Sequence, residues 1–360
     1  MKLIHVADLH LASKMESNLS KDQAKIRKRE LLDRFGDMIS YAAENDVSCI
    51  LIAGDLFDEK RIAKMVKTRV LDEIRMHPQI TFFYLQGNHD RSDFLMDVDL
   101  NDIPNLKLFS KEEWISYEFE DVVITGREIS SENAKTFTVN LVLDQAKTNI
   151  VMLHGQESNY IGRDRTETIP LGELRGKYID YLALGHIHSF KKERLDERGE
   201  YCYSGCLEGR GFDELGEKGF VLLTVEDKKI NAEFVPFAKR IFHEVSVELS
   251  EEDDMPSILK RIHLSCDEIP EKDLVKVVLT GHTGVDFDVD EDRILREFGD
   301  RFFFLKVKDE STIKVHYEDF LNDKSLKGEF VRLMEKQEIN EEDKAEIVEI
   351  GIRALMGEEL

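Results

Sequence analysis

The chain has 360 residues, of which 74 are acidic and 50 are basic, so its formal net charge is −24. Its length suggests two domains with room for a short third module. A hydrophobic content of 41% is enough for a buried core, so the composition excludes global disorder. The apolar runs, such as residues 50–53 and 151–153, are strand-sized, which excludes a membrane span. Four irregularly spaced cysteines fit neither a disulfide framework nor a zinc site, and we expect a soluble, cytoplasmic protein.

The negative charge is concentrated in the last third of the chain. Residues 241–360 hold 32 acidic and 16 basic side chains, so −16 of the total −24 lies there and −8 remains for residues 1–240. Phosphate contacts need a local positive field, so this balance argues weakly against non-specific nucleic-acid binding. Because screening acts over about 10 Å, a basic patch in the first domain could still function beside an acidic second domain. The composition therefore leaves nucleic-acid binding open.

Up to Pro236, short apolar strands alternate with helical segments, which is the pattern of an α/β layered fold. The expected strands are residues 2–7, 47–53, 80–85, 122–125, 149–153 and 181–184. The expected helices are residues 22–44, 63–76 and 131–147. Two hairpins are expected, one from residues 190–193 and 201–203 and one from residues 219–225 and 229–234.

After Pro236 the alternation restarts on a smaller scale and predicts a compact α/β cap. Its expected strands are residues 241–249, 274–280 and 301–307, and its expected helices are residues 255–263 and 290–298. Beyond His316 the pattern is purely helical, with one apolar stripe in residues 326–334 and a second in residues 347–356. We therefore expect three parts: residues 1–238, 239–318 and 322–360.

Five of the expected strands run directly into residues of the kinds that bind metals. These residues are Asp8 and His10, Asp55 and Asp58, Asn88 and His89, His154, and His186 and His188. In open α/β folds, ligands bind outside the carboxyl ends of strands, where loops from several strands converge. The mixture of carboxylate, imidazole and amide oxygen suits Mn, Fe or Zn better than Ca or an all-oxygen Mg site.

The set D-x-H, G-D-x-x-D, G-N-H-D, H-G and G-H-x-H is similar to that of the calcineurin-like metallophosphoesterases. Residues 7–11, 54–58 and 87–90 resemble the DNA repair exonuclease branch of that family, which contains the SbcD-like nuclease subunits. Residues 203–210, YSGCLEGR, are similar to the stretch that closes the phosphoesterase domain in that branch. The resemblance implies a layered sandwich of two mixed sheets flanked by helices, followed by a small α/β cap and C-terminal helices.

The resemblance also implies a role for each residue of the set. One metal ion would be held by Asp8, His10, Asp55 and His188, and a second by Asn88, His154, His186 and the bridging Asp55. Two cations about 4 Å apart can activate a hydroxide and stabilise both oxygens of a phosphodiester displacement. His89 would act as general acid, with Asp58 orienting its ring. We expect Mn as the metal, with Fe or Zn as alternatives.

Several arginines are candidates for contact with a nucleic-acid backbone. Arg27 and Arg29 belong to a basic stretch, residues 25–29, which can equally be an ordinary solvated helix face. The other candidates flank the ligand loops and are Arg61, Arg91, Arg163 and Arg165.

The C-terminal helices either pack on the cap or offer their apolar stripes to another helix. Related nucleases use such a module to hold an SMC-like ATPase, so the resemblance implies an ATPase partner of the SbcC type and a homodimer.

The leading hypothesis is a two-metal phosphodiesterase that cleaves DNA ends as an exonuclease, and as an endonuclease, in DNA repair. The first alternative is the same chemistry on a small phosphoester or a cyclic nucleotide. The second alternative is a non-catalytic interaction scaffold whose metal site is structural.

Overall fold

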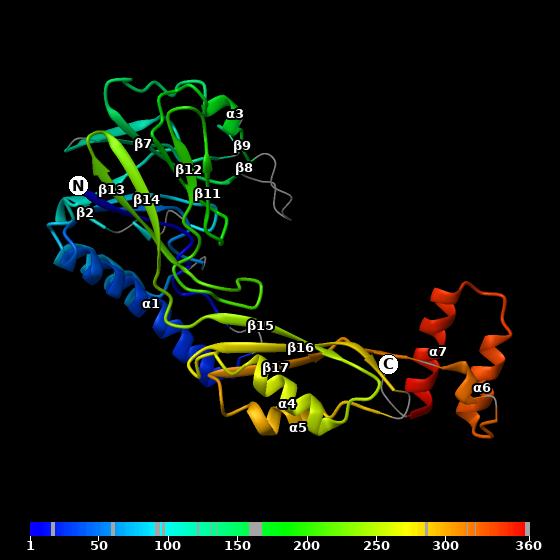
Figure 1. The fold of residues 1–360 in the computed structure, drawn as a ribbon. Coiled ribbons are helices and arrows are strands. Elements are labelled where there is room, and N and C mark those ends of the chain that lie inside the picture. Colours follow the sequence, from blue (N-terminus) through cyan, green and yellow to red (C-terminus); the bar gives the residue numbers. More distant parts are fainter. Residues whose placement is uncertain are drawn as a thin grey trace. The chain divides into compact units, whose positions relative to one another are not determined.

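The computed structural model describes residues 1–15, 19–58, 62–90, 94–95, 98–120, 122–130, 132–134, 136–157, 168–284, 287–314, 316–320 and 322–356 (Figure 1). The chain divides into two compact units, Met1–Ile241 and Phe242–Leu360. The expected cap and C-terminal helices fall together in the second unit, and the division of the chain into three parts stays a prediction.

The first unit contains two six-stranded mixed sheets. The first sheet has the order β14-β13-β1-β2-β3-β4, with β1 (Lys2–Val6), β2 (Val47–Ala53), β3 (Thr81–Leu85), β4 (Leu106–Leu108), β13 (Gly219–Glu226) and β14 (Lys229–Pro236). The second has the order β11-β12-β10-β7-β6-β5, with β5 (Ile115–Phe119), β6 (Val122–Gly126), β7 (Thr148–His154), β10 (Tyr181–Gly185), β11 (Lys191–Arg194) and β12 (Glu200–Tyr203). Strands β1 to β4 run parallel to one another, as do β6, β7, β10 and β12. The predicted sandwich of two mixed sheets is confirmed.

Both faces of the central strands are buried, because alternate side chains serve different layers. On β2, Leu51 lies in the layer shared with Met152 and Ala183 of the second sheet. Its neighbours Ile50 and Ile52 point the other way and pack with helix α1 (Lys21–Glu44) and helix α2 (Lys64–Met76). A third cluster covers the outer face of the second sheet. This packing explains why the central strands are nearly continuous apolar runs.

The predicted helix over residues 131–147 is wrong, since its described residues form turns. The Asn133 side chain accepts a hydrogen bond from the backbone N–H of Ser130 and donates to the carbonyls of Lys111 and Glu128. Side-chain bonds of this kind give the backbone an alternative to a helix. Among the short elements that the sequence pattern missed in the first unit are β4, β5, β8 (Gln156–Glu157), β9 (Thr168–Ile169) and α3 (Leu171–Leu174).

The second unit begins with a parallel sheet of order β15-β16-β17, and a short strand β18 (Thr312–Ile313) pairs with β16. Its elements are β15 (Phe242–Leu249), α4 (Met255–Ser265), β16 (Leu274–Thr283), α5 (Glu291–Phe298) and β17 (Phe304–Asp309). Ile258 and Ile262 of α4 and Ile294 of α5 fill the core against the strands. The strand expected over residues 301–307 begins three residues later than predicted, at Phe304.

Two further helices, α6 (Leu326–Glu335) and α7 (Glu341–Met356), share a small core of Phe320, Val331, Val348 and Ile352. Within the described part of the chain, we find no helix that is long and apolar enough to cross a membrane.

Arg27 of α1 is buried within the first unit, which corrects its expected role as a DNA contact. Its guanidinium lies 2.8 Å from Glu30 Oε2, 2.8 Å from Glu208 Oε1 and 2.8 Å from the carbonyl oxygen of Gly209. Glu30 also accepts hydrogen bonds from Arg240. The guanidinium therefore has no free face for a phosphate. Arg29, two residues later, points to solvent with 83% of its side chain exposed and lies 3.6 Å from Asp33.

We expect Arg27→Met to lower the free energy of unfolding by about 3–5 kcal/mol, because it removes the buried cation that Glu30 and Glu208 share. Arg29→Met should cost less than about 1 kcal/mol, since its ion pair is in water. Urea unfolding followed by the fluorescence of Trp114, the only tryptophan, measures both in the first unit. Equal effects of the two variants would contradict the assignment.

Candidate metal centre

Parallel strands of both sheets deliver the candidate ligands. Asp8 and His10 follow β1, Asp55 follows β2, and Asn88 follows β3 in the first sheet. In the second sheet, His154 ends β7, and His186 and His188 follow β10. Because β1, β2 and β3 are parallel, as are β7 and β10, the carboxyl ends within each sheet meet at one edge. The structure thus brings together residues that are up to about half the chain apart in sequence.

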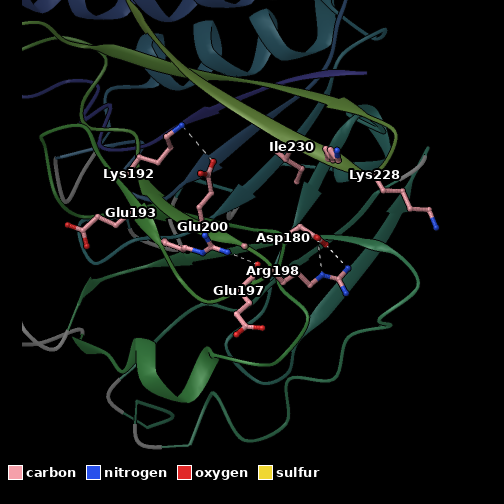
Figure 2. Close-up of a pocket in the computed structure, with 11 residues that line it drawn as sticks. Asp180, Lys192, Glu193, Glu197, Arg198, Glu200, Lys228 and Ile230 are labelled. Atoms are coloured by element: carbon pink, nitrogen blue, oxygen red, sulfur yellow. Dashed lines mark hydrogen bonds and ion pairs between the residues drawn. The ribbon is translucent and has the colours of Figure 1, made fainter.

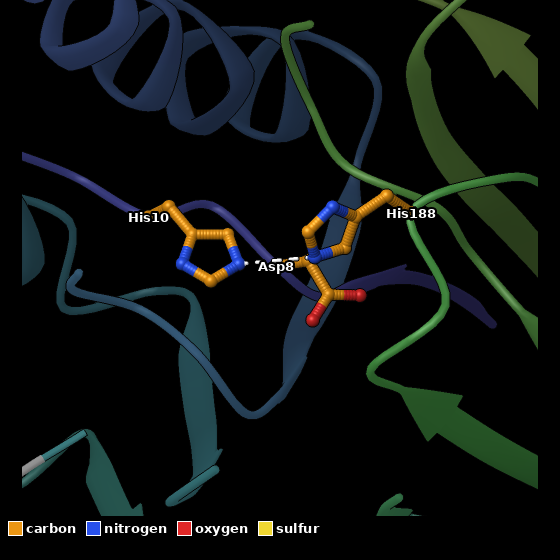
Figure 3. A group of neighbouring side chains, drawn as sticks. All are labelled: Asp8, His10 and His188. Carbon is orange, nitrogen blue, oxygen red and sulfur yellow. Dashed lines mark hydrogen bonds between the residues drawn. The ribbon is translucent and has the colours of Figure 1, made fainter. Parts of the chain in front are cut away.

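The first group of ligand atoms comes from Asp8, His10 and His188 (Figure 3). The Nε2 atoms of His10 and His188 face each other at 3.2 Å. Their donor atoms and a carboxylate oxygen of Asp8 all lie within 4.8 Å of one another. Two imidazole nitrogens and one carboxylate oxygen are donor atoms that a divalent cation binds, and here they lie close enough together to bind the same ion.

The second group comes from Asp8, Asp55 and His154. Asp55 Oδ2 lies 3.4 Å from His154 Nε2 and 3.7 Å from His10 Nε2, so this one oxygen reaches both groups. The Asn88 side-chain oxygen lies 3.0 Å from His154 Nε2 and 3.3 Å from His186 Nδ1. Asp55 is thus placed where a carboxylate shared by two cations would have to lie.

The backbone around the ligands is unusual. Asp8, His10, Asp55 and His186 all have positive φ, at 52°, 44°, 52° and 101°. Non-glycine residues seldom adopt this conformation, and clusters of it occur at functional sites. At Gly87 a Cβ atom would lie 2.3 Å from Asp55 Oδ1, and at Gly54 it would lie 2.1 Å from His154 Nδ1. Only glycine allows these loops to pass so close to the ligands.

Asp90 links the loop after β2 to the loop after β3 through hydrogen bonds. Its carboxylate accepts hydrogen bonds from the backbone N–H groups of Leu56, Phe57 and Gly87. Burial raises the pKa of Asp90 to about 6, with the nearby Asp55 charge acting in the same direction. The sequence pattern contained Asp90, but its role as a support for the loops after β2 and β3 was not predicted.

The buried charges compensate one another. Burial acts against the charged form of His154, but the Asp55 carboxylate outweighs it and raises the pKa of His154 to about 10. Burial also opposes ionisation of Asp55, yet His154 and His10 hold the pKa of Asp55 far below its ordinary value. Burial lowers the pKa of His10. A protonated His154 therefore balances Asp55 in the metal-free protein, and a cation would take over this role by displacing the proton.

His89 and Asp58 lie next to His10, and one donor atom from each of these three residues lies within 4.8 Å of the others, so they form a third group that could hold a cation. Asp58 Oδ1 lies 3.3 Å from His89 Nδ1 and 3.3 Å from His10 Nδ1. The hydrogen bond with Asp58 raises the pKa of His89, and the side chain of His89 is 47% exposed. A half-exposed imidazole whose protonated form is favoured by a carboxylate can donate its proton to a bound molecule.

The donor set fits a pair of divalent cations. It combines two buried carboxylates with four imidazoles and one amide oxygen, and Asp55 reaches both groups. Such mixed N and O sites accept Mn, Fe or Zn, and geometry alone does not select among them.

Of the six expected nucleic-acid contacts, the structure describes Arg27 and Arg29. Arg61, Arg91, Arg163 and Arg165 lie outside the described residues. Arg27 is buried in its ion pairs, and Arg29 is the one remaining candidate that the structure describes as exposed.

Two residues of the loop 204–218 were missed from the sequence. Glu214 Oε1 lies 2.7 Å from His188 Nδ1, so it fixes which ring nitrogen of His188 faces the metal group. Arg210 in turn lies 2.8 Å from Glu214 Oε1. Glu214 stands 26 positions after His188 with no pattern that links them, so only the fold reveals the contact.

A cavity of about 490 Å³ lies elsewhere on the first unit, where Arg198 pairs with Asp180 between β10 and the β11–β12 hairpin (Figure 2). Charged residues line most of it, and none of the candidate ligands does. It is therefore separate from the metal centre.

Comparison with known proteins agrees with this geometry. The family model for calcineurin-like phosphoesterases matches residues 1–190. An uncharacterized metallophosphoesterase of Bacillus subtilis, YhaO, is 26% identical over 309 residues, which cover 78% of this chain and 72% of that protein. The DNA double-strand break repair protein Mre11 of Sulfolobus acidocaldarius is 26% identical over 205 residues, which cover 54% of this chain and 52% of that protein. A solved dimetal phosphatase from Danio rerio has a TM-score of 0.42 at 12% identity, covering 63% of this chain and 93% of that chain.

We expect Glu214→Gln to weaken Mn²⁺ binding by about 10- to 100-fold, because the carboxylate that orients His188 loses its charge. Glu217→Gln, an exposed position in the same loop, is the matched control and should bind Mn²⁺ as the wild type does. Isothermal titration of metal-free protein measures both affinities. Equal binding by all three proteins would contradict the role of Glu214.

Proposed function

Because the chain belongs to the calcineurin-like metallophosphoesterase family, we propose that it is a two-metal phosphodiesterase that cleaves DNA ends in DNA repair. The observation that carries this proposal is the pair Asp58–His89 beside two ligand groups that both contain Asp8 and that Asp55 also approaches. Such a pair is useful for a leaving group that needs a proton, and the leaving alkoxide of a nucleic-acid phosphodiester is one.

When bound, two divalent cations would supply Lewis acidity and a hydroxide nucleophile. Asp8, His10, Asp55 and His188 would hold one ion, and Asn88, His154, His186 and the shared Asp55 would hold the other. His89 would donate a proton from Nε2, because its Nδ1 faces Asp58. Asp58 keeps the His89 ring oriented and favours its protonated form. We propose Mn as the metal, with Fe and Zn as the alternatives that the same donors accept.

The choice of DNA rests on two supports. The ligand-loop sequences resemble the DNA repair exonuclease branch, and relatives named Mre11 align with 22–26% identity. The net charge of −24 and the burial of Arg27 favour the alternative, a small phosphoester substrate. A substrate assay separates the two.

The C-terminal helices support a proposed partner. Leu326 and Leu333 of α6 and Ile347 and Leu355 of α7 are 68%, 54%, 39% and 43% exposed, although the same helices bury Val331 and Val348. We propose that this apolar face binds an SMC-like ATPase of the SbcC type. Homodimerisation and a cytoplasmic location belong to the same proposal.

We expect the purified chain with Mn²⁺ to shorten end-labelled DNA, and His89→Ala to reduce kcat by about 10²- to 10⁴-fold with its bound metal retained. The assay compares double- and single-stranded DNA with a chromogenic phosphodiester, and metal analysis counts ions per chain. A nuclease should also weaken steeply with salt.

Two other outcomes of this assay would favour the alternative functions. Cleavage of the small diester alone, insensitive to salt and to Arg29→Ala, would favour the small-phosphoester alternative. Two bound metal ions with no cleavage of either substrate would favour the scaffold.

We expect Leu333→Glu to abolish co-elution with an SMC-like ATPase from the same organism, while the unfolding midpoint stays unchanged, because Leu333 is exposed. Val331→Asp, a buried position two residues away, is the comparison and should unfold the helix pair. Loss of folding in both variants would indicate that the apolar face belongs to the core of the second unit.

A further inference from the structure

A network of ion pairs lies behind the metal ligand His188 and reaches the general-acid pair. It is built on the loop 204–218, which follows β12 of the second sheet and leads into β13 of the first. The loop therefore joins the two sheets next to the metal centre. Arg210 and Glu214 of this loop turn towards the imidazole of His188, and Lys218 donates to the carbonyl oxygen of His188 at 3.2 Å.

Glu214 fixes the position of Arg210. Its Oε1 accepts hydrogen bonds from Nε and Nη2 of the guanidinium, at 3.2 Å and 2.8 Å, and its Oε2 accepts one from the Arg210 backbone N–H at 2.7 Å. The Glu214 side chain is only 5% exposed, so these bonds form away from water. Two guanidinium N–H groups that donate to one charged oxygen, together with the backbone N–H on the other oxygen, hold Arg210 in place through charge-assisted hydrogen bonds.

The other side of the guanidinium faces the site. Arg210 Nη2 lies 3.2 Å from His188 Nδ1, and Nη1 lies 3.7 Å from Asp58 Oδ2. Asp58 uses its other oxygen, Oδ1, for His10 and His89, each at 3.3 Å. One carboxylate thus contacts two histidines through one oxygen, and among the described residues Arg210 pairs with the second oxygen.

We infer that Arg210 is a positioning residue for general-acid catalysis: it anchors the Oδ2 side of Asp58, so that Oδ1 stays against His89 and keeps the His89 ring oriented. This inference rests on the proposed function and adds a residue to it. Arg210 acts through Asp58 and leaves the phosphate to other groups. Its side chain is 19% exposed, which shields the Asp58 ion pair from most of the solvent.

Leaving-group chemistry tests this role. The dinucleotide TpT releases an alkoxide that needs a proton, whereas the p-nitrophenyl ester of thymidine 5′-phosphate releases a phenolate that does not. In the full chain with saturating Mn²⁺, we expect Arg210→Met to lower kcat on TpT by about 10²-fold and to change kcat on the p-nitrophenyl ester by less than about threefold. His89→Ala should show the same selectivity. The double variant should be no slower than His89→Ala alone, because both act on one step.

Three measurements accompany the kinetics. Arg198→Met is the matched control, because the Arg198 guanidinium likewise donates two hydrogen bonds to a carboxylate, that of Asp180, at 2.9 Å and 2.9 Å, but lies at the separate cavity (Figure 2). It should leave both rates unchanged. Bound metal per chain and the unfolding midpoint of Arg210→Met should match the wild type. A crystal structure of metal-free Arg210→Met should show Asp58 rotated away from His89.

Different failures point to different causes. Equal loss on both substrates, loss of bound metal, or a rise in KM alone would overturn the positioning role and leave the proposed function in place. If His89→Ala shows no leaving-group selectivity, its assignment as general acid fails and the inference fails with it. If the wild type cleaves neither ester, the proposed function itself is wrong.

Discussion

Buried negative charge is the constraint on which this structure depends. Asp8 and Asp55 are 0% and 1% exposed, and Asp58 stands close by. An ionised carboxylate costs several kcal/mol to bury unless it is paired and hydrogen-bonded. The surrounding features all reduce that cost: histidines lie within 4 Å, backbone N–H groups of His89 and His186 donate to Asp55 and Asp8, and glycines give room for the loops. A bound cation would complete the compensation.

The same constraint explains why so much of the site could be predicted from the sequence. Each ligand residue ends an apolar strand or follows one within four positions, so local alternation places it at a strand end, and parallel pairing then brings the ends together. Glu214 and Arg210 could not be found in this way. Their contacts depend on the path of a loop between two sheets, and no local period encodes that path.

Two wrong predictions have physical causes that a sequence pattern does not contain. Residues 131–147 carry helix-like apolar spacing, but the side chain of Asn133 bonds the nearby backbone, and Val139 and Val142 are exposed at 68% and 86%. Arg27 lies in a basic stretch that suggested a surface for phosphates. Its partner Glu208 lies 181 positions away, so the sequence gives no sign that its charge is already neutralised.

The lack of space at Gly54 and Gly87 has a consequence for how this protein could change over time. A methyl group at either position would collide with His154 or Asp55, so alanine there should displace a ligand without altering any chemical group that reacts. A survey of mutational tolerance along the chain would therefore rank these two glycines with the ligands themselves. Sequence change around the metal centre is thus limited by the space available at these glycines as strictly as it is by the charge of the ligands.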